Sequence, residues 1–130
     1  MKGEGVVHAL RHVHGLLAPN GTLVDMHPVT EEQVEGAGEP VGVIREPEWL
    51  SVDLPNSEAA LRQVITEGLY EVEAETEYDV LEHFADPDEL LDAKRDLLET
   101  QDALIDAIRV APQPLVTRMH VVFRRLRAVK

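Results

Sequence analysis

The chain begins with hydrophobic residues at helical spacing, namely Val6, Leu10, Val13 and Leu17. This spacing predicts an amphipathic helix from about Gly5 to Leu17 with one apolar stripe. The run Pro19-Asn20-Gly21 ends the helix, because proline cannot continue it and Asn-Gly readily adopts a positive φ. The strand that follows, Thr22 to Met26, is apolar on both faces, which is typical of a sheet covered by helices on both sides.

The next segment is polar and then helical. Residues 30–40 are rich in glutamate and glycine and predict a mobile acidic loop. Val41 to Arg45 has the composition of a short strand, and an irregular link with two prolines follows it. Asn56 or Ser57 is expected to cap a second helix, and Gly68 marks the end of that helix.

Apolar and polar residues alternate from Tyr70 to Phe84, which predicts a long strand. One face of this strand carries a row of five carboxylates: Glu71, Glu73, Glu75, Glu77 and Asp79. A flat strand cannot wrap a calcium ion, so the row is interpreted as a solvated or salt-bridged face.

The third helix has a clear start and stop. Asp86-Pro87-Asp88-Glu89 supplies a cap, a first-turn proline and an acid three residues after the cap. Heptad-spaced leucine and isoleucine predict one helix to about Val110, after which two prolines stop it and residues 115–129 form a final strand. The expected fold is therefore a single α/β domain over residues 1–130, with three helices and a small sheet of three or four strands in mixed directions.

Composition limits the classes of function. The net charge of −13 argues against nucleic acid and anionic membranes as partners, because phosphate contacts need clustered cations. With no cysteine, the chain has no disulfide, thiolate metal site or cysteine nucleophile, and it fits the reducing cytoplasm. No apolar run approaches the roughly 18 residues that a membrane span needs.

Charge is unevenly distributed along the chain. All 25 acidic residues lie at or before Asp106, whereas half of the 12 basic residues lie at or after Arg109. The basic residues of the final strand alternate with apolar ones, which indicates a strand built into the fold. Because opposite charges stabilise neighbouring strands and like charges destabilise them, we expect the strand at 70–84 to pair antiparallel with the strand at 115–129.

Ala9 to Asp25 reads Ala-Leu-Arg-His-Val-His-Gly-Leu-Leu-Ala-Pro-Asn-Gly-Thr-Leu-Val-Asp. This segment resembles the helix, Pro-Gly-Gly-like turn and fifth strand of class I S-adenosylmethionine-dependent methyltransferases, with Asn20 where the family usually has its first glycine. The strands at 70–84 and 115–129 resemble that family's closing pair, whose last strand inserts beside the fifth, antiparallel to the others. The resemblance covers the carboxyl-terminal half of the family's Rossmann-like domain.

The family's cofactor half has no counterpart in the chain. That half contributes a glycine-rich turn after the first strand and an acid that holds the ribose, and no glycine-rich turn follows a strand here. The resemblance therefore implies no cofactor-binding residue and no catalysis by the isolated chain. S-adenosylmethionine, and the family's methyl transfer, are expected only if the missing half is supplied.

Two pairs of side chains have spacings that suit chemistry. Asp25 and His27 lie two apart on a strand, so both face one side, where they could act as orienter and base, line a small-molecule pocket, or simply satisfy each other. His8 and His12 lie four residues apart on a helix, a spacing that can present two imidazoles to one metal ion. The alternative is that both histidines lie on the solvated face of the helix.

Two functions from different classes fit these observations. The first is a methyltransferase-like domain that acts as a non-catalytic binding or oligomerisation module. The second is the substrate-side half of a split or truncated methyltransferase. The strand at 22–27 would have an open, unguarded edge, so a homodimer or a partner chain supplying the missing half is expected. The alternative is that Val41 to Arg45 covers this edge.

Overall fold

The sheet is organised around the last strand, β5 (Leu115–Ala128), in a computed structural model that describes residues 3–130. The strand order is β1 (Thr22–Pro28), β5, β2 (Glu32–Gly36) and β3 (Glu39–Ile44), and β4 (Tyr70–Phe84) also pairs with β5. The five strands are antiparallel. The α/β class is confirmed, but the prediction of three or four strands in mixed directions is wrong.

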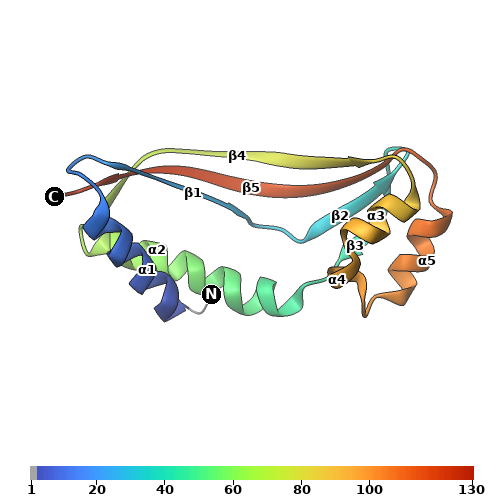
Figure 1. The fold of residues 1–130 in the computed structure, drawn as a ribbon, viewed down its shortest axis with the longest axis horizontal. Helices are drawn as coiled ribbons and strands as arrows, with labels where there is room; N and C mark the ends of the chain where they lie inside the picture. Colours follow the sequence, from blue (N-terminus) through green and yellow to red (C-terminus); the bar gives the residue numbers. More distant parts are fainter. Residues whose placement is uncertain (1–2) are drawn as a thin grey trace. The chain divides into compact units, whose positions relative to one another are not determined.

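The chain forms two compact units, of which the first contains residues up to His27, Pro47–Glu77 and Val122–Lys130. Its helices are α1 (Gly3–Leu16) and α2 (Leu54–Thr66), which both lie on one side of the strands of this unit (Figure 1). Its buried core consists of Val7, Ala60, Leu61, Val64, Tyr70, Leu126 and Ala128. The Tyr70 hydroxyl donates to the Leu10 carbonyl at 2.6 Å, which fixes α1 against β4.

The second unit contains residues 28–46 and 78–121. Here the β2–β3 hairpin and the neighbouring part of β5 pack with three short helices, α3 (Pro87–Ala93), α4 (Arg95–Leu98) and α5 (Asp102–Val110). Its buried core consists of Val34, Ile44, Phe84, Leu90, Leu98, Ile108 and Leu115.

The segment at 30–40 is a hairpin and not the predicted acidic loop. Glu32, Val34 and Gly36 of β2 are buried, while the residues between them are more exposed, which is the alternation of a strand. The sequence did not reveal this alternation, because a glutamate and a glycine occupy two of the three buried positions. Ala37 and Gly38, both at positive φ, make the turn into β3. The predicted short strand from Val41 to Arg45 is confirmed in position, since Val41 to Ile44 form the end of β3, and Arg45 lies just after it.

The predicted single helix from Asp86 to Val110 is also wrong, because it is broken into α3, α4 and α5. The second break lies at Gln101, whose backbone leaves the helical region at φ −120° and ψ 57°. Its side chain accepts from the Arg45 amide at 2.9 Å and donates to the Leu97 carbonyl at 2.8 Å. This tie to the end of β3 holds the turn that separates α4 from α5.

Other boundaries agree better with the sequence. The first helix, the break with Asn20 at φ 62°, the strand at 70–84 and the end of α2 at Gly68, with φ 80°, are confirmed. The predicted cap at Asn56 or Ser57 is wrong, because a π-helical turn (Trp49–Asp53) already leads into α2 with helical φ and ψ.

The prediction that β1 is covered on both faces is wrong. Leu23, Asp25 and His27 are partly buried, but the intervening Val24 and Met26 are 52% and 59% exposed. The reason is visible in Figure 1, where both helices of this unit lie on the same side of β1.

Candidate functional site

Asp25 and His27 lie on the same face of β1, as their spacing predicted, and this face is directed toward α2. His27 Nδ1 lies 3.2 Å from Asp25 Oδ1, and His27 Nε2 contacts Glu58 Oε1. Alternation along the strand gives both side chains the same face, and Glu58 reaches them from the second turn of α2. A carboxylate therefore faces each ring nitrogen of His27.

Arg124 of β5 completes this cluster. Its guanidinium nitrogens lie 3.2 Å from Asp25 Oδ2, 3.3 Å from Glu58 Oε2 and 2.8 Å from Glu75 Oε1. The Arg124 side chain is only 15% exposed. Sequence reasoning missed Glu58 and Arg124, because they lie 31 and 97 residues from His27 and no local spacing connects them to it. The only signal was the general expectation that buried charges are paired.

The electrostatics of the cluster are those of a closed ion-pair network. Burial opposes the charged form of Glu58, but the hydrogen bond from His27 and the attraction of Arg124 outweigh it and lower the Glu58 pKa. Burial likewise opposes the Arg124 charge, and the carboxylates around it raise its pKa. Because both nitrogens of His27 are engaged, this arrangement favours a structural tie between β1, β5 and α2 over a general base.

Ion pairs between β4 and β5 confirm the predicted pairing of the acidic and basic strands. In the first unit Arg127 contacts Glu71, and Arg125 Nε lies 3.1 Å from Glu73 Oε2. In the second unit Arg118 Nη1 lies 2.9 Å from Asp79 Oδ2. The carboxylate row of β4 is therefore largely a salt-bridged face.

His8 and His12 are both exposed on α1. Across the part of the chain that the structure describes, no three His, Asp or Glu side chains are grouped so that they could hold a metal ion. Among the described residues, no third candidate ligand is grouped with His8 and His12, and metal binding by this pair stays a prediction.

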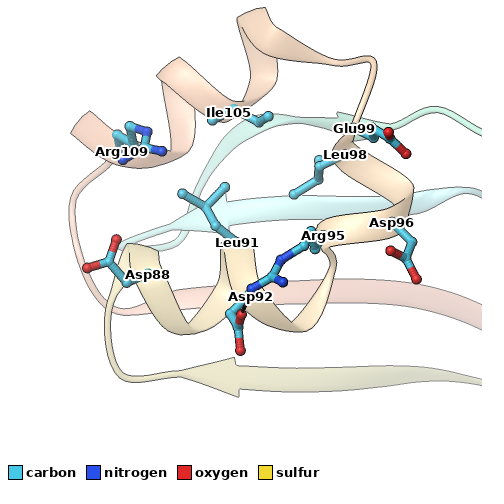
Figure 2. A pocket seen from close by; sticks show the side chains of 9 residues that line it. All are labelled: Asp88, Leu91, Asp92, Arg95, Asp96, Leu98, Glu99, Ile105 and Arg109. Atoms are coloured by element: carbon cyan, nitrogen blue, oxygen red, sulfur yellow. Dashed lines mark hydrogen bonds and ion pairs between the residues drawn. The ribbon is translucent and has the colours of Figure 1, made fainter.

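A cavity of about 530 Å³ lies in the second unit and was not anticipated from the sequence. Figure 2 shows the nine side chains that line it, which come from α3, α4, α5 and the turn after α4. Leu91, Leu98 and Ile105 form its apolar part, and charged residues surround them. These three residues are one of the two heptad-spaced sets that predicted one long helix, and they line this cavity because the helix is broken.

No family model, curated protein or solved structure matches this chain. Among residues 3–130, no helix is both long and apolar enough to cross a membrane.

Proposed function

We propose that the chain is a non-catalytic interaction module, methyltransferase-like in ancestry, that forms a homodimer through the outer edge of β1. The observation that carries this proposal is the position of β1. Within the described residues β5 is its one neighbouring strand, and the side chains of Val24 and Met26 are more than half exposed beside that edge. A strand edge flanked by exposed apolar side chains is a template for another strand.

The two outer strands of the first unit differ in how they are protected. β4 carries a carboxylate at every second position from Glu71 to Asp79, and charged side chains discourage pairing with another chain. β1 has no lysine or arginine, and proline occurs in it only at its last residue, Pro28. Association is therefore expected through β1 and not through β4.

Charge also favours a second copy at this strand. Two chains that each carry a net charge of −13 repel each other, so they can meet only where the local charge is low. The single acid of β1, Asp25, faces α2 and is paired with Arg124. An antiparallel pair of β1 strands would place Val24 and Met26 of both copies on one continuous face, as a two-fold axis requires.

The chain does not cover this edge with its own short strand. The alternative drawn from the sequence was that Val41 to Arg45 lies along β1, and it is wrong, because β3 pairs with β2.

Light scattering at micromolar concentrations tests the proposal. The wild-type chain is expected at about twice its mass of 14.5 kDa, and Val24→Lys or Met26→Lys should return it to one copy. Val110→Lys is the matched control, because Val110 is 83% exposed on α5 and belongs to the second unit. A wild-type mass that stays near 14.5 kDa on concentration, or equal dissociation by the control variant, would contradict a dimer through β1.

One observation favours a second candidate, the substrate-side half of a methyltransferase whose cofactor half is supplied separately. β5 lies between β1 and β4 and is antiparallel to both, which is the order that the family resemblance implies for these strands. In this case a strand of the cofactor half would occupy the β1 edge. Calorimetric titration with S-adenosylmethionine distinguishes the two, because the chain alone should not bind it more tightly than millimolar, whereas a complex with a cofactor half should.

A further inference from the structure

The cavity of the second unit has the size of a small-molecule site. Its volume of about 530 Å³ lies within the roughly 300–1,000 Å³ of typical ligand pockets. It is lined by α3, α4 and α5 and owes its existence to the break at Gln101, since one continuous helix could not surround it. This site is separate from the β1 edge and does not depend on the function proposed for that edge.

The middle of the cavity is apolar. Leu91 and Ile105 are partly exposed there, although both also pack against the buried core, and Leu98 is a buried core residue that also lines the cavity. Figure 2 shows Leu91 extending into the space below α5. Partly exposed aliphatic side chains that converge in a concave site favour the apolar body of a ligand.

The charges around this apolar centre are unequal. Arg95 is paired with Asp92, which neutralises both. The remaining lining charges are Asp88, Asp96, Glu99 and Arg109, so three carboxylates face one guanidinium. Asp96 and Glu99 both lie on one side of Leu91, whereas Arg109 and Asp88 lie on the other side (Figure 2).

We propose that this cavity binds a small organic cation, a primary amine on an aliphatic or aromatic body. The ammonium group would lie on the side of Asp96 and Glu99, and the apolar body of the ligand would lie on Leu91 and Ile105. An organic anion would meet two carboxylates at the same position. The net charge of the chain acts in the same direction, because a strongly acidic protein concentrates cations near its surface.

Calorimetry with a matched series of probes tests this proposal. Hexylamine carries the ammonium and the apolar body, hexanoate reverses the charge, 1-hexanol removes it, and ethylamine removes most of the apolar body. Hexylamine is expected to bind at least tenfold more tightly than each of the others. Amide NMR shifts caused by hexylamine should fall on residues 88–109. Equal binding of hexylamine and hexanoate, no measurable hexylamine binding, or shifts elsewhere would overturn the proposal.

Charge variants give a second test that does not disturb the core. Asp96→Asn with Glu99→Gln should weaken hexylamine about tenfold, since each exposed ion pair contributes about threefold. The control is Asp102→Asn with Asp106→Asn, which removes the same charge from exposed positions of α5 outside the cavity lining. If both double variants weaken hexylamine equally, the effect is only that of net charge and the site is refuted.

Discussion

Arg124 on the last strand and Glu58 on α2 lie 3.3 Å apart, with Nη2 facing Oε2. The same guanidinium also contacts Asp25 of β1 and Glu75 of β4. One side chain thus ties three strands and a helix of the first unit together. Removing it would leave partly buried carboxylates without their cation, which costs more than the ion pair contributes.

Arg124→Met is therefore expected to lower the free energy of unfolding by about 2–3 kcal/mol. Arg125→Met is the matched control, because the adjacent arginine is 54% exposed and forms an exposed ion pair with Glu73, so its replacement should cost no more than about 0.5 kcal/mol. Urea unfolding at pH 7 measures both. Similar losses in the two variants would show that the cluster around Arg124 has no special role.

Acid should weaken this same cluster through Glu58. Its folded-state pKa is lowered, so its stabilising contribution is complete above the ordinary value of 4.5 and is lost as the pH falls through the folded-state pKa. Glu58→Gln should therefore reduce the loss of stability below pH 4.5. The measurement is the urea midpoint from pH 3 to pH 7, and an unchanged slope in the variant would contradict this role.

Glu46 in the second unit should behave in the opposite way. Burial, together with Glu32 and Glu31, raises its pKa, so the folded protein loses stability as the pH rises through the range above 4.5. Glu46→Gln is expected to raise the free energy of unfolding at pH 7 by about 0.5 kcal/mol. This gain in the free energy of unfolding should disappear at pH 4, because the Glu46 carboxyl is then largely protonated and is neutral like the glutamine that replaces it. A variant that is less stable at pH 7 would refute this assignment.

Local sequence signals predicted those features that depend on local chemistry. The start at Asp86 is confirmed, because its side chain accepts from the Glu89 amide at 2.8 Å while Glu89 accepts from Ala85. Alternation over residues 70–84 located β4 with correct bounds. In these cases the interaction that stabilises the element lies within a few residues along the chain.

Features that depend on distant residues were not predictable in this way. Heptad leucines indicated one long helix, but the bond between Gln101 and Arg45, 56 residues apart, accompanies a break in it. Glutamates at 31–39 suggested a loop, yet β2 is held by β5 through pairs such as Val34 with Thr117. The candidate pair Asp25 and His27 was found from spacing alone, whereas its partners Glu58 and Arg124 required the fold.

The cap at Asp86 can be tested against a position that lacks a cap bond. Asp86→Ala should lower the free energy of unfolding by about 1 kcal/mol. Asp86→Asn should keep most of the stability that the cap contributes, because asparagine is also a good N-cap residue. Asp53→Ala is the control, because Asp53 precedes α2 with helical φ and ψ and makes no side-chain cap bond. Thermal unfolding monitored by circular dichroism compares them, and equal losses would show that capping is not the cause.

Three glycines should respond differently to alanine. An added Cβ at Gly36 would lie 2.6 Å from the Pro112 carbonyl oxygen, so Gly36→Ala should cost about 1–3 kcal/mol. An added Cβ at Gly42 would lie 2.6 Å from Cδ1 of Leu104, at the far end of a side chain that can change its rotamer. Gly42→Ala should therefore cost less stability than Gly36→Ala. An added Cβ at Gly15 in α1 would lie within 4 Å of no atom beyond the neighbouring backbone of its own helix, so Gly15→Ala should stabilise the fold by about 0.5–1 kcal/mol. Unfolding midpoints in a different order would contradict these contacts.

The central position of β5 has a consequence for the order in which the protein can fold during its synthesis. β1, β2 and β4 all pair with this strand, and it leaves the ribosome after all of them. Before residues 115–128 emerge, only the β2–β3 hairpin and the helices have local partners. The apolar residues of β1 and β4 must therefore remain without strand partners until residues 115–128 have been made, and during that time a chaperone or a second nascent chain can reach them.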